Sequence, residues 1–377
     1  MNVPVPSIHP TRAIINLAAL RHNLHRVKAY VGPTTKIMAV VKSHAYGHGV
    51  RTISHEVVRG GVYYLGVARV EEGLELRQDG VDTPILAFEI APEGQCEWAI
   101  SADLELTISS LEQAQWLASL AQRMGHTLRV HSKVDTGMSR LGLSHEAAPD
   151  CIEQIARLRR LELAGVYSHF ATAEDDDQSF ARQQLHRFNR VLEELDRRRI
   201  AVPLRHMANS AATITLPDSH FDMVRPGIML YGYGPTKELA SEAQLKPVMS
   251  LFSRITLMKK VPAGTAISYG RRFTTQHETW IATVPAGYGD GYSRMLTNKA
   301  EVLIRGKRYP VVGTICMDHC MIDVGTSGEV RLGDEVTLLG GTGDEWISAW
   351  SIAEQLGTIP YEVTCMVSAR VPRTVLS

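Results

Sequence analysis

The sequence lacks an excess of charge of either sign. It contains 40 basic and 40 acidic residues among 377, so its formal net charge at pH 7 is zero, and no basic stripe runs along the chain. Nucleic acids are bound mainly through clustered Lys and Arg side chains. The balance therefore argues against a nucleic-acid-binding protein.

Cysteine pairs and long apolar runs are also missing. The five cysteines are odd in number and form no C-x-x-C pair, which favours reduced thiols. No apolar run approaches the roughly 20 residues of a membrane-spanning helix. The first ten residues have neither the basic segment nor the apolar core of a signal peptide. We therefore expect a cytoplasmic protein with no membrane partner.

What the chain does contain is an alternation of short apolar runs with longer amphipathic stretches. Eight apolar runs of strand length occur at 36–41, 62–67, 84–89, 104–108, 127–134, 161–168, 203–209 and 221–227. Helical spacing precedes the first run at 17–30 and recurs between later runs, for example at 111–124 and 180–198. This alternation predicts an α/β fold, a parallel (β/α)8 barrel over residues 12–238.

The sequence pattern changes after about Pro235. The segments that follow are β-rich and mostly punctuated by Gly, Pro or Asp, at 248–261, 279–289, 300–306, 308–315, 320–325 and 334–340. Only residues 348–356 have helical spacing. The pattern predicts a mostly antiparallel β domain over 239–377 together with residues 1–11. A further strand predicted over 11–16 is a candidate to add to this domain.

Polar and charged residues follow several of the predicted barrel strands. Lys42 follows the first strand, and the fifth to eighth strands are followed by Arg140, His169, Ser210 and Arg225. Active sites of such barrels lie at the carboxyl ends of the strands, so we expect these residues to share one rim. The strand before Lys42 is almost entirely apolar, and burial favours the neutral amine that Schiff-base chemistry requires.

Residues 39–49 read AVVKSHAYGHG, and this segment resembles the cofactor-lysine signature of the alanine racemases. Other segments resemble further motifs of that family, in the family's order: HSKVDTGMSRLG, YSHFATAED, MANSAAT, MVRPGIMLYG, ISYGRRF, PAGYGDGY, GTICMDH and IPYEV. The resemblance covers essentially the whole chain. It implies an amino-acid racemase that depends on pyridoxal 5'-phosphate.

The resemblance also assigns the cofactor contacts. Lys42 would bind the cofactor covalently, Arg225 would face its pyridine nitrogen, and His169 would support Arg225. The phosphate would be held by Tyr46, Ser210, Gly227, Ile228 and Tyr361. Because arginine stays protonated, it gives the ring no proton, and the ring is a weaker electron sink than one paired with a carboxylate. This choice should favour simple reprotonation over transamination.

Racemisation needs a planar carbanion with a base on each face, because one base mostly returns its proton to the face it came from. The resemblance assigns the two bases to Lys42 and Tyr269. Arg140 would lie near the cofactor's phenolic oxygen and the substrate carboxylate, and we expect it to stabilise the Tyr269 phenolate. Met317 would contact the carboxylate through its backbone amide.

The family builds its active site across a head-to-tail homodimer. Tyr269 and Met317 lie in the predicted β domain, so by resemblance they would come from the partner subunit, and a monomer should be nearly inactive. Tyr288 would line the substrate's path into the site, with Asp318 in the same outer group. Lys133 is either an ordinary ion-pair partner or, as in some family members, the carrier of a carbamate.

The two histidines near Lys42 do not predict a metal site. His44 and His48 have the spacing of one helical turn, but Gly47 between them indicates a loop. We expect them to form hydrogen bonds near the cofactor, and we expect no bound metal.

The chain departs from the family's usual sequence at four positions. Ser43 and His44 replace the usual Ala and Asn, Gly289 replaces the usual Ala of GYADGY, and Glu89 stands where small residues are common. The first three lie close to the expected chemistry, so the breadth of substrates stays open.

Three other functions compete with alanine racemisation. A serine or broader-specificity racemase has the same architecture, but most such relatives are exported. A decarboxylase of basic amino acids would place a carboxylate opposite the pyridine nitrogen and use a cysteine acid, so Arg225 and Tyr269 argue against it. A single-barrel carrier of the cofactor would lack the second domain. We expect alanine racemisation that supplies D-alanine for peptidoglycan.

Overall fold

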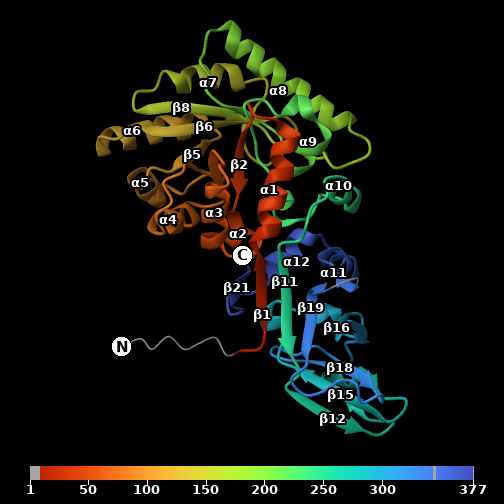
Figure 1. The fold of residues 1–377 in the computed structure, drawn as a ribbon. Coiled ribbons are helices and arrows are strands. Elements are labelled where there is room, and N and C mark those ends of the chain that lie inside the picture. The colour runs from red at the N-terminus through yellow and green to blue at the C-terminus, as the bar shows by residue number, and fades with distance from the viewer. Residues whose placement is uncertain (1–8, 343–344, 377) are drawn as a thin grey trace. The chain divides into compact units, whose positions relative to one another are not determined.

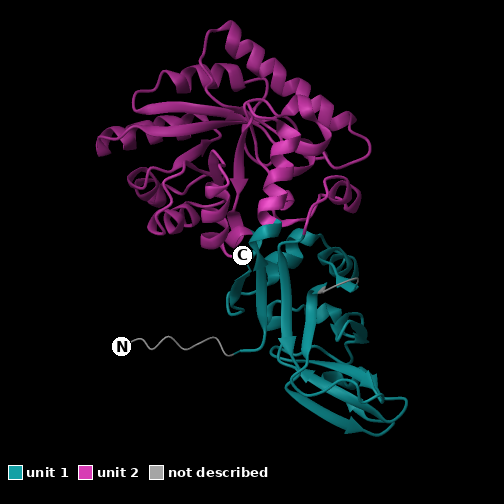
Figure 2. Ribbon diagram, viewed as in Figure 1, with its two compact units in different colours: residues 1–19, 46–48, 247–377 teal, residues 20–45, 49–246 magenta. Residues whose placement is uncertain are grey.

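The computed structural model describes residues 9–342 and 345–376, which form two compact units. Unit 1, teal in Figure 2, takes the described residues up to Ala19, Tyr46–His48 and the residues from Pro247 onward. Unit 2, magenta, takes Leu20–Ala45 and Gly49–Lys246. Neither unit is therefore a single continuous stretch of sequence.

Unit 2 is a ring of parallel strands with helices on its outside (Figure 1). Its strands are β2 (Lys36–Val40), β3 (Tyr64–Val67), β4 (Ile85–Ala87), β5 (Glu105–Ile108), β6 (Leu128–Asp135), β8 (Leu161–Tyr167), β9 (Arg205–His206) and β10 (Met223–Val224). β10 also pairs with β2. Backbone hydrogen bonds from Asp222 N to Arg205 O and from Arg225 N to Ala208 O join the residues flanking β10 to β9 and the residues after it, so the ring is nearly closed. The predicted eight-stranded barrel is confirmed.

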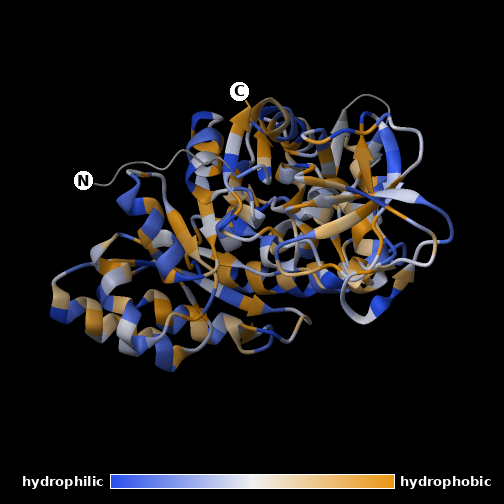
Figure 3. Ribbon diagram, turned by 90° about the horizontal axis from the view of Figure 1, so that it is seen from below, coloured by the Kyte–Doolittle hydropathy of each residue, from blue (hydrophilic) through white to orange (hydrophobic). Residues whose placement is uncertain are grey.

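The helices of unit 2 alternate with its strands, and the first helix, which begins within the residues of unit 1, precedes β2. They are α1 (Leu17–Val31), α3 (Val50–Arg59), α4 (Val70–Gln78), α5 (Glu93–Ser101), α6 (Leu111–Met124), α7 (Ala148–Ala156), α8 (Ser179–Arg197), α9 (Ser210–Thr215) and α10 (Lys237–Glu242). Their ribbons carry alternating hydrophilic and hydrophobic bands (Figure 3). In α6, Ser110 caps the first turn by accepting from Gln113 N, and left-handed Gly125 ends the helix. A short strand, β7 (Leu143–Ser144), pairs with β6.

The inside of the barrel contains an apolar layer and a polar layer. Met38, Tyr64, Leu86, Leu204 and Met223 pack together, with Phe88 against them. A Cβ atom on Gly66 would come within 2.6 Å of the Phe88 ring, so only glycine makes room for that ring. The polar layer includes three fully or almost fully buried residues, Glu105, His131 and His206.

Unit 1 is built on an open sheet with the order β17-β16-β19-β11-β1-β21, in which only β1 and β21 run parallel. Its strands are β1 (Arg12–Asn16), β11 (Met249–Arg254), β16 (Glu301–Ile304), β17 (Lys307–Pro310), β19 (Glu335–Thr342) and β21 (Arg373–Leu376), and β20 (Glu345–Ile347) pairs with β19. The predicted antiparallel β domain is confirmed.

Two smaller sheets complete unit 1. They are formed by β12 (Leu257–Val261), β15 (Thr279–Val284) and β18 (Cys320–Gly325), and by β13 (Ala266–Ile267) with β14 (Phe273–Thr274). Ile267 of β13 packs with Ile281 and Val312 in a small apolar core, and Phe273 of β14 lies against it.

The expectation of a single helix after Pro235 is wrong. Besides α11 (Ala349–Leu356), the structure contains α12 (Pro360–Met366) and α10. Both additional helices are shorter than two turns, which is too short for a hydrophobic period to be recognised. Pro360 at the first helical position of α12 is a start signal that could have been used. No helix among the described residues is long and apolar enough to cross a membrane.

Candidate active site

The carboxyl ends of the barrel strands carry the residues that the sequence points to. Lys42 lies two residues after β2, His169 two residues after β8, and Arg225 directly after β10. Arg140 lies in the loop after β6, and Ser210 begins α9 after β9. Unit 2 therefore places all five at one rim of the barrel.

The backbone that follows Lys42 forms a left-handed turn. Ser43, His44, Ala45 and Tyr46 have φ angles of 53°, 55°, 54° and 52°, in the segment assigned as α2 (Lys42–Tyr46). This conformation costs roughly 1–2 kcal/mol per L-residue, so it persists only where neighbouring groups hold it. It fixes where the chain leaves the strand, and hence where Lys42 stands.

Glu72 in the first turn of α4 supports this turn, and the sequence interpretation missed it. One carboxylate oxygen accepts from Ser43 N at 2.6 Å, and the other accepts from Ala68 N at 2.7 Å. Glu72 thus ties the left-handed turn to the end of β3. Nothing in the local sequence signals the Ser43 contact, because the two residues are 29 positions apart, whereas a Glu as the third residue of a helix often accepts from the amides just before it.

Positive charge is concentrated at the rim. Burial, followed by the cations Arg225, Lys133, Arg140 and Lys42, lowers the pKa of His169 well below its usual value, so this imidazole is neutral. Burial and the neighbouring Arg225 and Arg140 lower the pKa of Lys133 to about 7, against a smaller opposing effect of Asp135. Such an excess of cations suits an anionic ligand.

Arg225 is held by several acceptors from the barrel wall. Nη1 donates to His206 Nδ1 at 3.0 Å, and Nη2 lies 2.6 Å from Ser168 O and 3.1 Å from His169 Nδ1. Burial lowers the pKa of Arg225 to about 10, which still leaves it charged at neutral pH. The expected support of Arg225 by His169 corresponds to a hydrogen bond here.

Ser210 and the start of the next helical turn form a group of polar hydrogens. The Ser210 hydroxyl accepts from Gly227 N at 2.9 Å and from Met229 N at 3.4 Å. Within the described part of the chain it donates to no protein acceptor, so its hydrogen is available to a ligand. Ile228 begins the 3-10 helix η2 (Ile228–Tyr231), where the first amide has no partner within the helix. These groups fit a phosphate.

Two tyrosines expected at the phosphate lie together in unit 1. The rings of Tyr46 and Tyr361 have centroids 6.1 Å apart. Burial raises the pKa of Tyr46, which remains a neutral hydrogen-bonding phenol. A Cβ atom on Gly47 would lie 2.1 Å from Thr364 O, so the neighbouring glycine is required for this close approach to α12.

Unit 1 also gathers the residues expected to act from a partner. Tyr269 begins η3 (Tyr269–Arg271) between β13 and β14, and its carbonyl accepts from Thr314 Oγ1 at 2.7 Å. Tyr288 begins η4 (Tyr288–Asp290), and its amide donates to Cys316 O at 3.1 Å, next to Met317. Tyr269, Tyr288 and Met317 are 71%, 42% and 52% exposed. Their backbones are fixed while their side chains face outward.

Arg370 joins this group and was also missed. It pairs with Asp318 and with Asp290 at 2.9 and 2.8 Å. A Cβ atom on Gly289 would lie 2.6 Å from its guanidinium. An alanine at position 289 would therefore collide with Arg370 where this side chain now lies.

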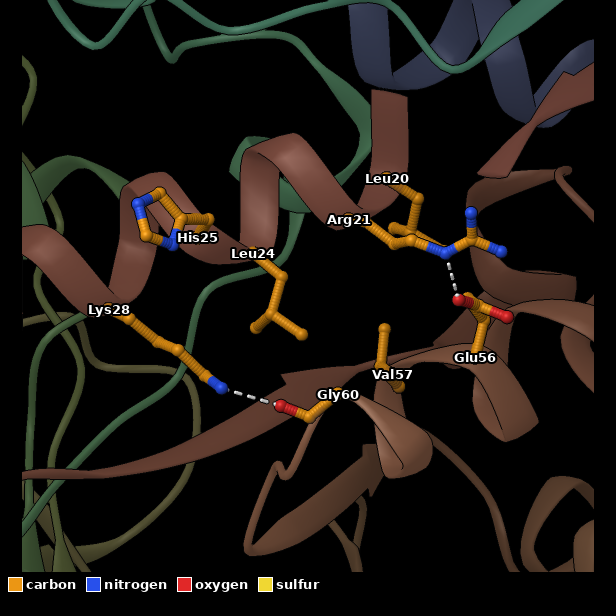
Figure 4. A pocket seen from close by; sticks show the side chains of 8 residues that line it. All are labelled: Leu20, Arg21, Leu24, His25, Lys28, Glu56, Val57 and Gly60. Atoms are coloured by element: carbon orange, nitrogen blue, oxygen red, sulfur yellow. Dashed lines mark hydrogen bonds and ion pairs between the residues drawn. The ribbon is translucent and has the colours of Figure 1, made fainter. Parts of the chain in front are cut away.

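A hollow elsewhere in unit 2 is not a candidate site. It lies between α1 and α3 on the outer helical layer and is lined by Leu20, Arg21, Leu24, His25, Lys28, Glu56, Val57 and Gly60 (Figure 4). Arg21 pairs with Glu56 at 2.5 Å, and Lys28 donates to Gly60 O at 2.6 Å, as the dashed lines in Figure 4 show. The charged groups of Arg21 and Lys28 in this hollow are thus already bound within the protein.

A strand-end lysine, a cluster of cations and a group of amide and hydroxyl donors define a barrel enzyme for an anionic small molecule. Residues 15–235 match the family of alanine racemase N-terminal domains, and residues 248–375 match that of the C-terminal domains. The chain belongs to the alanine racemase family and is an amino-acid isomerase.

Individual relatives agree over nearly the whole length. The chain is 44% identical to the alanine racemase of Desulfovibrio desulfuricans over 364 residues, 97% of each protein. It superposes on the solved alanine racemase of Clostridium difficile 630 with a TM-score of 0.94 at 39% identity, covering 98% of this chain and 96% of that one. For the Bartonella henselae alanine racemase, solved with covalently bound pyridoxal phosphate, the TM-score is 0.86 at 28% identity, with 97% and 99% covered.

Proposed function

We propose that this enzyme interconverts L- and D-alanine with pyridoxal 5'-phosphate bound at the barrel rim. The observation that carries the proposal is the cluster of Lys42, Lys133, Arg140 and Arg225 around a neutral His169. A phosphate and a substrate carboxylate would neutralise these charges.

The donors of the rim suit this cofactor. Ser210, Gly227 and Ile228 would hold the phosphate, and the family resemblance adds Tyr46 and Tyr361 as proposed phosphate ligands. Arg225 would face the pyridine nitrogen through N–H groups that the barrel wall does not use. When bound, the cofactor supplies an electron sink for the carbanion formed at the substrate Cα.

The protein itself would move the protons. Lys42 would take or return the Cα proton on one face of the substrate, and Tyr269 of a partner subunit would do so on the other. Arg140 would hold the carboxylate and stabilise the phenolate of the partner's Tyr269. The high exposure of Tyr269 and Met317 supports a role at a second subunit.

The homodimer, the shared site and the cellular role remain parts of this proposal. Tyr288 and Asp318 would line the path of the substrate, next to Met317. In the cytoplasm the D-alanine formed would supply peptidoglycan synthesis, as the family resemblance implies.

The first experiment measures D-alanine from L-alanine and D-serine from L-serine with purified, cofactor-loaded enzyme. Rapid D-alanine formation that is lost in Lys42→Ala and in Tyr269→Phe supports the proposal. Dominant D-serine formation would make serine the substrate, which the departures at Ser43, His44 and Gly289 leave open. A loaded enzyme that forms neither product would overturn it.

A further inference from the structure

A chain of four buried hydrogen-bonding side chains crosses the inside of the barrel. Arg225 Nη1 lies 3.0 Å from His206 Nδ1, His206 Nε2 lies 2.9 Å from His131 Nδ1, and His131 Nε2 lies 2.7 Å from Glu105 Oε2. Both histidines have no exposed surface, and Glu105 and Arg225 are only 2% and 4% exposed. Solvent therefore has little part in these contacts.

This series of hydrogen-bonded side chains runs from the candidate active site toward the opposite face of the barrel. Arg225 follows the carboxyl end of β10, whereas Glu105 is the first residue of β5. His206 on β9 and His131 on β6 lie between them. In barrels of this type the carboxyl face carries the catalytic groups and the amino face contributes to stability. This series of hydrogen-bonded side chains therefore connects the two faces.

The positions of the protons follow from the chemistry of the two ends. A guanidinium can only donate, so His206 Nδ1 must accept and its proton must sit on Nε2. His206 then donates to His131 Nδ1, which leaves the His131 proton on Nε2, pointing at Glu105. Burial and the neighbouring Arg225 lower the pKa of His206 well below its usual value, in agreement with a neutral ring.

Glu105 is held as the acceptor at the far end. Its carboxylate also accepts from Tyr64 Oη at 3.0 Å, and Arg129 Nη1 lies 2.5 Å from Oε1. Arg129 has a second carboxylate partner, Glu162, at 3.5 Å, and both of these side chains are partly exposed. Replacing Glu162 thus changes the environment of Arg129 without touching the buried chain.

Arg225 depends on this arrangement. In the part of the chain that the structure describes, no carboxylate is hydrogen-bonded to Arg225, and its charge meets neutral imidazoles and carbonyls. A reversed tautomer of His206 would point an N–H at the guanidinium, and two donors would face each other.

We propose that Glu105 is a positioning residue that sets the tautomers of His131 and His206 and thereby holds Arg225 in place for the cofactor. The part that concerns the cofactor rests on the proposed function. The tautomers themselves do not.

Glu105→Gln tests the proposal with little change of shape. The cationic Arg129 would retain the amide oxygen, so the amide NH2 would face His131 Nε2 and reverse both tautomers. We expect ¹⁵N NMR of labelled histidines, or a neutron structure, to find the protons on Nε2 in the native enzyme and on Nδ1 in this variant. We also expect about tenfold weaker binding of pyridoxal phosphate. Glu162→Gln, the matched control, should keep the native tautomers and affinity.

A His131 pair covers the case in which Glu105→Gln fails to fold. Glutamine at 131 can accept from His206 and donate to Glu105, so His131→Gln should keep the His206 tautomer and bind the cofactor within about threefold of native. His131→Leu breaks the chain and should weaken binding about tenfold. Equal affinities for the two variants would contradict the proposal, as would a proton on Nδ1 of His206 in the native enzyme.

The two proposals can fail separately. Native tautomers as derived, in a protein that binds no pyridoxal phosphate, would refute the proposed function and leave the positioning of Arg225 intact. Racemisation by an enzyme whose His206 carries its proton on Nδ1 would refute only the role of Glu105.

Discussion

The strand-end rim of unit 2 and the Tyr269 region of unit 1 present their functional side chains differently. Arg225, Ser210 and Lys133 are at most 5% exposed and are surrounded by the barrel wall. Tyr269 and Met317 are more than half exposed, and in each the backbone carbonyl is held, by Thr314 Oγ1 at Tyr269 and by Gly289 N at Met317. The side chains of the rim are held by other residues of unit 2. In the Tyr269 region the backbone is held, and the side chains face outward.

The sharpest test of this difference is complementation between two inactive variants. Lys42→Ala and Tyr269→Phe should each lose roughly 10²–10⁴-fold in kcat, because each removes a proposed base. Co-expressed, they should regain about one quarter of native activity, because half of randomly formed dimers are mixed and each contains one intact site. If both bases came from the same chain, mixing would restore nothing.

The buried cations of the rim should have a measurable effect on stability. The pKa of Lys133 is lowered from 10.5 in the unfolded chain to about 7. Between these values the unfolded chain binds a proton that the folded chain does not, so stability should rise with pH by up to about 1.4 kcal/mol per unit. Below pH 7 both states are charged and the full penalty remains. Lys133→Met should remove this rise in urea titrations, whereas the exposed Lys259→Met should keep it.

A carbamate on Lys133 would change that outcome. The neutral amine reacts with carbon dioxide, and the surrounding Arg225, Arg140 and Lys42 would stabilise the resulting anion. Gentle native mass spectrometry with bicarbonate should then detect a carbon dioxide adduct in the native protein and none in Lys133→Met. A native protein without the adduct would leave Lys133 as an ordinary amine.

A smaller effect is expected where the rim depends on a single support. Glu72→Gln puts an NH2 group against one of the two amides, Ser43 N or Ala68 N, and should lower stability by about 1–2 kcal/mol. Because the Ser43 contact holds the turn after Lys42, kcat should fall as well. The neighbouring Glu71→Gln is the control. If the variant were less stable but had the native kcat, the contact with the turn would support stability and not catalysis.

The smallest effect is expected in the exposed region. Gly289→Ala would displace mainly the Nη2 end of Arg370, which contacts the exposed Asp318, whereas Nε can keep its contact with the buried Asp290, so stability should change by less than about 1 kcal/mol. Since Arg370 lies beside Met317, we expect KM for alanine and serine to shift by a few fold at nearly constant kcat. A large fall in kcat would show that Arg370 also acts on the chemical step.

Local patterns in the sequence predicted much of this molecule. All eight barrel strands lie within the predicted apolar runs to within a residue, and α6 has the predicted bounds. The β13–β14 hairpin, whose connection contains Tyr269, was not foreseen, because two-residue strands carry no period. Lys42, His169 and Arg225 could be singled out because each follows a strand.

The sequence by itself determined the order of strands and helices and the residues at the strand ends, since burial of one face imprints a period on nearby positions. Only the tertiary structure decided which polar groups meet. The contact of Glu105 with His131, and of His206 with Arg225, depends on the register of strands up to 75 residues apart in sequence. The left-handed turn after Lys42 likewise depends on Glu72, from a different element. Such contacts arise from the packing of whole elements, which no local pattern records.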